Sequence, residues 1–263
     1  MITLIYVSKA AEFMRRIAVI NQKGGVGKTT TAVTLAWGLS SKGKKVLLLD
    51  MDAQGNVATC LGINPDKTMY HVLVERRSWK DCITKINDNL HVIPSNETLE
   101  KAEILLAGEP SRETLLRRLL DPVAGYDYII ADCPPSLGLL NQNALLFADE
   151  AIIPVSTEHL GVQALKKMLL AIESLNEVFR HHIRVTAIVP TMYDRRNKTC
   201  VDSIRLIRQA YDGVVTEPIR INSKLKEAPA SGKPILAYAK SSNGAKDYEL
   251  LVTRFMGKSK SYT

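Results

Sequence analysis

The sequence predicts an α/β fold, a single domain built on a mostly parallel, twisted sheet with helices on both faces. With 263 residues, of which 46% are hydrophobic, the chain can bury a full core. Short apolar segments of strand length alternate along it with segments of helical periodicity, a pattern typical of a parallel sheet covered on both sides. No segment rich in proline, glycine or serine divides the chain. We therefore expect one domain.

The elements follow from these segments in order. Strands are expected at 16–21, 45–50, 90–94, 128–132, 151–155, 185–190 and 214–217. A helix is expected at Thr29–Ser41, where alanine, valine and leucine form a mostly buried face, and Gly43 ends it. Further helices are expected at 115–120, 139–148, 162–178, 200–211 and 244–256. Residues 14–257 form the domain and 258–263 a C-terminal tail. Residues 1–13 are either a genuine N-terminal extension or lie before a natural start at Met14.

Composition excludes several classes of protein. The apolar content is too high for a disordered chain. The cysteines are scattered, without the spacing of a disulfide scaffold or a metal finger, which fits a reducing cytosol; they are Cys60, Cys82, Cys133 and Cys200. No apolar run approaches the roughly 18 residues of a membrane span, and the N-terminus lacks the basic region of a secretion signal. We expect a cytoplasmic protein that does not bind membranes.

The net charge of +8 is concentrated at one end of the chain. Residues 180–263 contain 16 Lys or Arg against 7 Asp or Glu, which gives +9, and the remaining residues therefore sum to −1. This distribution indicates either a polyanionic partner for the last third of the chain or simply a soluble basic surface.

A glycine-rich segment lies where the first strand must turn into the first helix. Glycines allow successive N–H groups to surround phosphate oxygens, and the N-terminus of the helix adds partial positive charge. In such a loop Lys28 reaches the phosphates and the Thr29 hydroxyl holds Mg²⁺. The predicted phosphate-binding residues are Gly24, Gly25, Val26, Gly27, Lys28, Thr29 and Thr30. The sequence therefore predicts a P-loop domain that binds ATP and Mg²⁺.

Acidic residues close two further apolar strands. Asp50 and Asp52 follow one of them, and because they are two residues apart in an extended chain they point to the same side. Asp132 closes another strand and resembles a Walker B carboxylate, which binds Mg²⁺ through water. We expect these three carboxylates at a metal and water site, with Thr29, Asp50 and Asp132 on the metal side.

The phosphate loop departs from the general P-loop pattern, since Gln22 occupies the position of the first glycine and Lys23 precedes the paired glycines. The stretch from Asn21 to Thr30 resembles the deviant Walker A motif of the ParA/Soj branch of the ParA–MinD ATPases. The resemblance runs from about residue 16 to 255. It implies that Lys23 crosses a nucleotide-sandwich homodimer to touch the partner's phosphates, and that Asp52 positions the attacking water. Lys23, Lys28 and Asp52 are thus the expected catalytic residues.

The same resemblance covers the segments that flank the nucleotide base. It implies base contacts at Met192, Asn222 and Pro229. The sequence departs from the family's pattern here, with Arg220 where the family has proline and Ile221 where it often has arginine.

The resemblance implies a DNA partition ATPase. The ATP-bound dimer binds double-stranded DNA without sequence preference, associates with the nucleoid, and is released when a ParB-type activator stimulates weak ATP hydrolysis. Its cargo is a plasmid or chromosome centromere complex. Two alternatives remain open: a membrane-cycling regulator of the MinD type, and ParA-type positioning of a cargo other than DNA. The expected DNA contacts lie in the basic last third, at Arg205, Arg208, Lys224, Lys226, Lys246 and Arg254.

Overall fold

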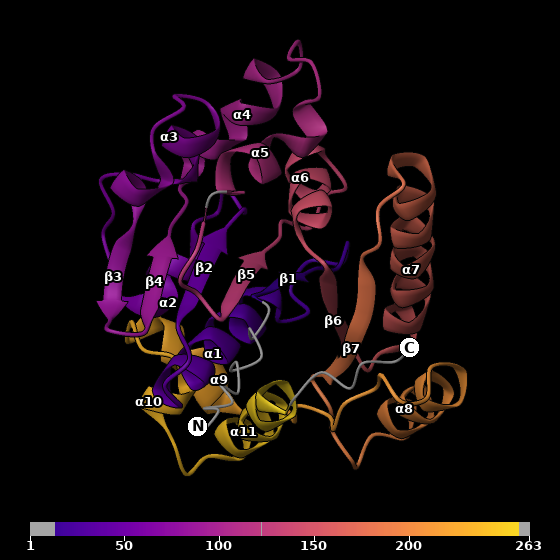
Figure 1. The fold of residues 1–263 in the computed structure, drawn as a ribbon. Helices are drawn as coiled ribbons and strands as arrows, with labels where there is room; N and C mark the ends of the chain where they lie inside the picture. Colours follow the sequence, from indigo (N-terminus) through magenta and orange to yellow (C-terminus); the bar gives the residue numbers. More distant parts are fainter. Residues whose placement is uncertain (1–13, 122, 258–263) are drawn as a thin grey trace, which may run out of the picture.

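The computed structural model describes residues 14–121 and 123–257. In these residues a seven-stranded sheet runs through the molecule in the order β3-β4-β2-β5-β1-β6-β7 (Figure 1). The strands are β1 (Arg15–Val19), β2 (Val46–Asp50), β3 (Thr84–Asn87), β4 (Leu90–Ile93), β5 (Tyr128–Asp132), β6 (Glu150–Ser156) and β7 (Arg184–Thr191). The predicted N-terminal extension 1–13 and tail 258–263 lie outside the described residues.

Every strand pairing is parallel except the one between β3 and β4. Because the strands run the same way, β1, β2 and β5 all end at one edge of the sheet. The register places Asp132 beside both Val19 and Asp50. The fold therefore gathers the two acidic strand ends next to the turn that leaves β1.

Helices cover both faces of the sheet (Figure 1), as predicted. One layer contains α1 (Lys28–Ser41), α2 (Asn56–Leu61), α9 (Ser223–Ala230), α10 (Ile235–Tyr238) and α11 (Asn243–Met256). The other contains α3 (Met69–Leu73), α4 (Glu100–Leu105), α5 (Leu115–Leu120), α6 (Leu139–Phe147), α7 (His159–Phe179) and α8 (Lys198–Ala210). Strand alternation explains the two cores, because Ile17 and Val19 face the α1 layer whereas Ala18 and Ile20 face the α6 layer.

One predicted strand was wrong, and one strand was missed. Residues 214–217 do not form a strand, since their pairing with β7 is reduced to one isolated bridge between Ile188 and Val215. Instead the antiparallel strand β3 borders the sheet beside β4. Its sequence, Thr-Lys-Ile-Asn, is short and polar because an edge strand with one covered face needs little apolar surface.

The last helix of the described chain is part of the core. Phe255 is buried, and its carbonyl accepts hydrogen bonds from Arg15 Nη1 at 3.0 Å and the Tyr128 hydroxyl at 2.7 Å. Gly38 of α1 lies so close to Val252 of α11 that a Cβ atom there would overlap the valine side chain. The Val252 side chain of α11 therefore packs directly on the backbone of α1. None of the described helices is long and apolar enough to cross a membrane.

Candidate nucleotide site

The turn between β1 and α1 is tied by hydrogen bonds to the neighbouring strands β6 and β7. Buried Asn21 donates from Nδ2 to the carbonyl of Pro154 on β6 at 2.7 Å and accepts the N–H of Lys23 at 3.0 Å. The Thr191 hydroxyl, at the end of β7, donates to the carbonyl of Val26 at 2.9 Å. These bonds fix the backbone of the loop on both sides.

The first turn of α1 is suited to bind an anion. Gly27 precedes the helix with φ of 88°, a left-handed conformation that favours glycine, and among the described residues no side chain caps the helix. The first N–H groups of the helix thus lack side-chain partners and face the loop. Partial positive charge at a helix N-terminus favours phosphate.

Lys28 and Lys23 occupy different environments. The Lys28 side chain is buried, and its ammonium donates to the carbonyl of Lys23 at 3.3 Å. Burial lowers the Lys28 pKa, although Asp132 and Asp52 partly offset this effect. Lys23, by contrast, extends toward β6, where its ammonium pairs with Glu158 at 2.8 Å and donates to the Ser156 hydroxyl at 3.2 Å. Lys28 points into the site and Lys23 lies at its rim.

Asp50 and Asp132 are both fully buried at the ends of adjacent strands. Asp50 accepts backbone N–H groups from Asp52 at 3.0 Å and from Val57 at 3.3 Å. Neither oxygen of Asp132 has a hydrogen bond of good geometry within the described residues, although the Thr29 hydroxyl is near enough to lower its pKa. Burial nevertheless dominates and raises the Asp132 pKa to about 7. Burial, together with Asp132, raises the pKa of Asp50 as well.

An unpartnered, buried carboxylate is costly unless a ligand completes its contacts. Asp132 beside Thr29 fits a Mg²⁺ ion bound through water. In residues 14–121 and 123–257 no group of three or more His, Cys, Asp or Glu side chains is arranged to hold a metal alone. That also fits Mg²⁺, which usually keeps several waters and binds substrate phosphates with only one or two carboxylates.

Asp52 lies half-buried just beyond these two carboxylates, where its Oδ1 accepts the N–H of Gln54 at 3.0 Å. Its charge contributes to the raised pKa of Asp132 and partly offsets the lowering at Lys28. The predicted catalytic group is therefore gathered at one edge of the sheet. The sequence analysis assigned no role to Glu158, Ser156 and Thr191, which lie at or just beyond the ends of β6 and β7.

The predicted base contacts are only partly brought together. Met192 directly follows β7 and has φ of 55°, a left-handed conformation that is uncommon for a side-chain residue and often marks a functional site. Its side chain is exposed, and the adjacent Thr191 holds the phosphate loop. Asn222 instead caps α9, accepting the N–H of Lys224 at 2.9 Å.

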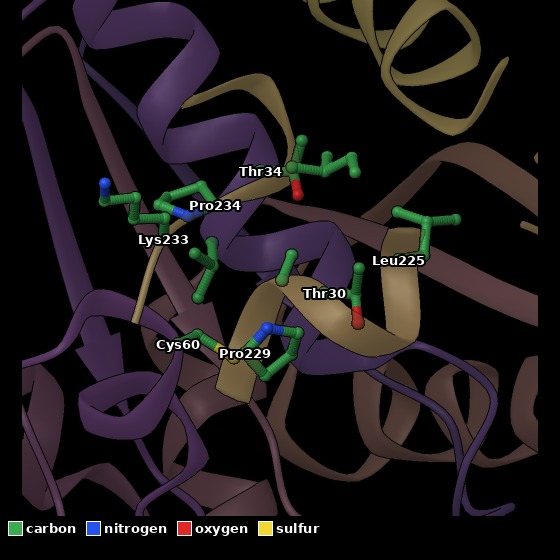
Figure 2. A pocket seen from close by; sticks show the side chains of 10 residues that line it. Thr30, Thr34, Cys60, Leu225, Pro229, Lys233 and Pro234 are labelled. Atoms are coloured by element: carbon green, nitrogen blue, oxygen red, sulfur yellow. The ribbon is translucent and has the colours of Figure 1, made fainter. Parts of the chain in front are cut away.

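Pro229 lines a small pocket between α1, α2 and the α9–α10 segment (Figure 2). Thr30 and Thr34 border this pocket from α1, and Cys60 and Lys233 complete its rim. Its volume of about 20 Å³ is enough for a water molecule but far too small for a purine ring. Pro229 and Thr30 thus line the same small pocket, and the contact of Pro229 with the base stays a prediction.

The fold and this edge of the sheet define a P-loop nucleoside triphosphatase. A family model described as an AAA domain matches residues 14–185. The chain is 41% identical over 238 residues to the sporulation initiation inhibitor protein Soj of Bacillus subtilis, covering 88% of this chain and 94% of that protein. It is 39% identical over 249 residues to the chromosome partitioning protein ParA of Myxococcus xanthus, covering 92% and 88%. The chain belongs to the ParA/Soj family of partition ATPases, which confirms the resemblance.

The chain also resembles a solved structure that contains a bound nucleotide. Cobyrinic acid a,c-diamide synthase from Mycobacterium smegmatis, with bound ADP and magnesium, superposes with a TM-score of 0.80 at 30% identity. The match covers 93% of this chain and 94% of that one. The predicted fold class is thereby confirmed.

The raised pKa of Asp132 leads to a prediction about stability. Between its ordinary value of 3.8 and about 7 the folded state binds a proton that the unfolded state does not. The free energy of unfolding therefore falls as pH rises through this range. Asparagine cannot ionise, so nucleotide-free Asp132→Asn should melt at least about 2 °C above the wild type at pH 8, with a smaller difference at pH 5. Scanning calorimetry measures this shift. Asp88→Asn, at an exposed carboxylate, is the control, and an Asp132→Asn variant that melts below the wild type at pH 8 contradicts the expectation.

Proposed function

We propose that this chain is a Mg²⁺-dependent ATPase that partitions DNA, through an ATP-bound dimer that binds DNA without sequence preference. The observation that carries the proposal is the different position of the two lysines in the site. Lys28 is buried in the phosphate loop, whereas Lys23 stands at its rim and contacts Ser156 at the end of β6 and Glu158 just beyond it. A lysine at the rim would be free to turn toward a ligand shared with a second subunit, which supports the proposed role of Lys23.

Binding and hydrolysis would use the groups already gathered at the sheet edge. The loop N–H groups and Lys28 would hold the phosphates. Thr29 and Asp132 would hold the Mg²⁺ ion, and Asp50 would support its shell. The ion would offset charge on the phosphates, and positioning and electrostatics supply most of the catalysis in phosphoryl transfer. Asp52 would orient the attacking water, since only one of its oxygens is occupied by the Gln54 N–H in the described residues.

We propose weak turnover by the protein alone. Arg15 and Arg16 are the arginines nearest to the phosphate loop in the described sequence. They form ion pairs with Glu150 and Asp121 and are therefore not free to contact the phosphates. An activator of the ParB type would supply the missing group. The membrane-cycling alternative depends on a C-terminal segment beyond the fold, and Phe255 is instead buried in the core.

The proposed DNA surface lies on α8, α9 and α11. Three of its six basic residues form ion pairs: Arg205 with Asp202, Arg208 with Glu217 at 3.2 Å, and Lys224 with Glu227 at 2.7 Å. Arg254 donates to the carbonyl of Gly213 at 2.7 Å. Lys226 and Lys246 are exposed and have no ion-pair partner within the described chain. These two lysines are the strongest candidates for phosphate contacts, because no local carboxylate offsets their charge.

Charge reversal tests this surface. The double variant Lys226→Glu with Lys246→Glu should weaken ATP-dependent binding to unrelated duplexes. It should also reduce the slope of log affinity against log salt by about 0.9 for each phosphate that the variant no longer neutralises. Fluorescence anisotropy at several salt concentrations measures both quantities, and sedimentation with ATP checks the dimer.

The matched control is Lys166→Glu with Lys167→Glu on α7, which changes the charge equally on another exposed helix. An equal reduction in both variants would assign the effect to net charge alone. Absence of ATP-dependent DNA binding in the wild type would overturn the proposed function itself.

A further inference from the structure

Arg220 and Asp247 join two parts of the molecule that the proposed function uses separately. The Arg220 guanidinium donates from Nη2 to Asp247 Oδ1 at 2.6 Å and from Nε to Oδ2 at 3.0 Å. The backbone N–H of Arg220 donates to the same Oδ2 at 3.0 Å. The Asp247 side chain is only 8% exposed. Two parallel charge-assisted bonds and a backbone bond fix this contact in one geometry.

Arg220 lies in the segment that carries the predicted base contacts. The N–H of Tyr193 donates to the carbonyl of Ile219 at 3.1 Å, and the N–H of Ile221 donates to the carbonyl of Tyr193 at 3.0 Å. Met192 directly precedes Tyr193, and Asn222 follows two residues after Arg220. The two predicted base contacts are thus held on neighbouring strand-like segments, with Arg220 at the pairing between them.

Asp247 lies on α11, which carries the predicted DNA contacts Lys246 and Arg254. The start of this helix packs directly on α9, since a Cβ atom at Gly244 would lie 2.8 Å from Cγ of Leu225 and 3.4 Å from Cβ of Asn222. The ion pair therefore adds a directional bond to a contact that already has no free space. Helix α11 is thereby joined to residues 192–193 and 219–222, which carry two of the predicted base contacts and are called the base-side segment below.

Ion pairs elsewhere in the basic third have a different character. Arg208 and Glu217 join side chains that are 47% and 68% exposed at 3.2 Å. Such exposed pairs usually contribute little to stability, because water and salt screen them. The Arg220–Asp247 pair instead joins residues 27 positions apart, and its carboxylate is nearly buried. Removing the arginine would therefore leave an uncompensated charge in the interior.

We propose that Arg220 is a positioning residue, which through Asp247 fixes α11 relative to the base-side segment and so couples nucleotide binding to DNA binding. The proposal rests on the proposed function. Arg220 need not touch nucleotide or DNA, because its effect is to keep the Met192–Asn222 region and the Lys246–Arg254 face in register. By reciprocity, DNA should then tighten ATP binding as much as ATP tightens DNA binding.

The variant Asp247→Asn separates this role from a simple charge effect. It removes a negative charge and releases Arg220, so electrostatics alone predicts tighter DNA binding. The coupling predicts the opposite, a decrease of about fivefold or more in DNA affinity at saturating ATP. It also predicts a smaller effect of DNA on ATP affinity. Both affinities can be measured by fluorescence anisotropy with labelled duplex and labelled ATP analogue.

Glu217→Gln is the matched control, because it removes the same charge from the exposed pair with Arg208; its DNA affinity should be unchanged or slightly higher. Arg220→Lys keeps the positive charge but not the two-pronged geometry, and it should lose coupling as Asp247→Asn does. It also provides the test if Asp247→Asn fails to fold. Unchanged or tighter DNA binding in a folded Asp247→Asn or Arg220→Lys variant, with wild-type coupling, would overturn the inference. A wild type that binds no DNA with ATP would overturn the proposed function instead.

Discussion

Replacing Asp52 by alanine is expected to lower ATP hydrolysis about 100-fold or more, while ATP binding and ATP-dependent dimerisation persist. The magnitude is typical for loss of a group that accepts or directs a proton in the transition state. Binding should survive because Asp52 lies beyond Lys28 and the loop N–H groups that would hold the phosphates. Phosphate release measures turnover in the presence of DNA and activator, and equilibrium titration measures ATP affinity.

Asp66→Ala serves as the control, since it removes one exposed carboxylate further along the chain. Equal loss of activity in both variants would point to a general charge effect. Wild-type turnover in Asp52→Ala would show that another group orients the water.

Replacing Lys23 by alanine is expected to weaken ATP-dependent dimerisation about 30-fold or more while leaving ATP binding within a few-fold. In the proposed dimer, the contact between Lys23 and the partner's phosphates would be buried. Truncating one member of such a charge contact typically costs about 2 kcal/mol or more, which corresponds to this factor. The structure favours this separation because Lys23 contacts Glu158 and Ser156 at the rim, whereas Lys28 occupies the interior. Sedimentation velocity with Asp52→Ala as the background, in which ATP is preserved, gives the dimer fraction.

Lys28→Ala should lose ATP binding and dimerisation together, which makes it the comparison for Lys23→Ala. A Lys23→Ala protein that still dimerises with ATP would remove the basis for a nucleotide shared across two subunits.

The sequence predicted most of the sheet because its central strands are continuously apolar. Strands buried on both faces, such as Val46–Asp50 and Tyr128–Asp132, have short, continuously apolar sequences that are typical of the centre of a parallel sheet. The edge strand Thr84–Asn87 was missed because half of it faces water. Residues 214–217 were wrongly assigned because an apolar run does not specify whether neighbouring backbone will pair with it.

The candidate site was predicted better than its supporting contacts. Glycine spacing and acidic strand ends are local signals, and parallel strands necessarily bring Asp50 and Asp132 to one edge. The partners of Lys23 lie more than 130 residues away, and nothing in the local sequence connects them. Asp247 was missed for the same reason, because the alternation of residues along α11 shows that it faces inward but not which arginine it meets.

The burial of α11 has a consequence for synthesis of the chain. The core on the α6 side of the sheet contains residues from Ala18 to Ile207, whereas the α1 side also needs Tyr248, Val252 and Phe255. At about 5–20 residues per second, several seconds of translation separate these segments. During that interval the side of α1 that packs against α11, at Gly38, is not yet covered, because Val252 has not been made. The incomplete chain would therefore be open to capture by chaperones on the side that carries the phosphate-loop helix.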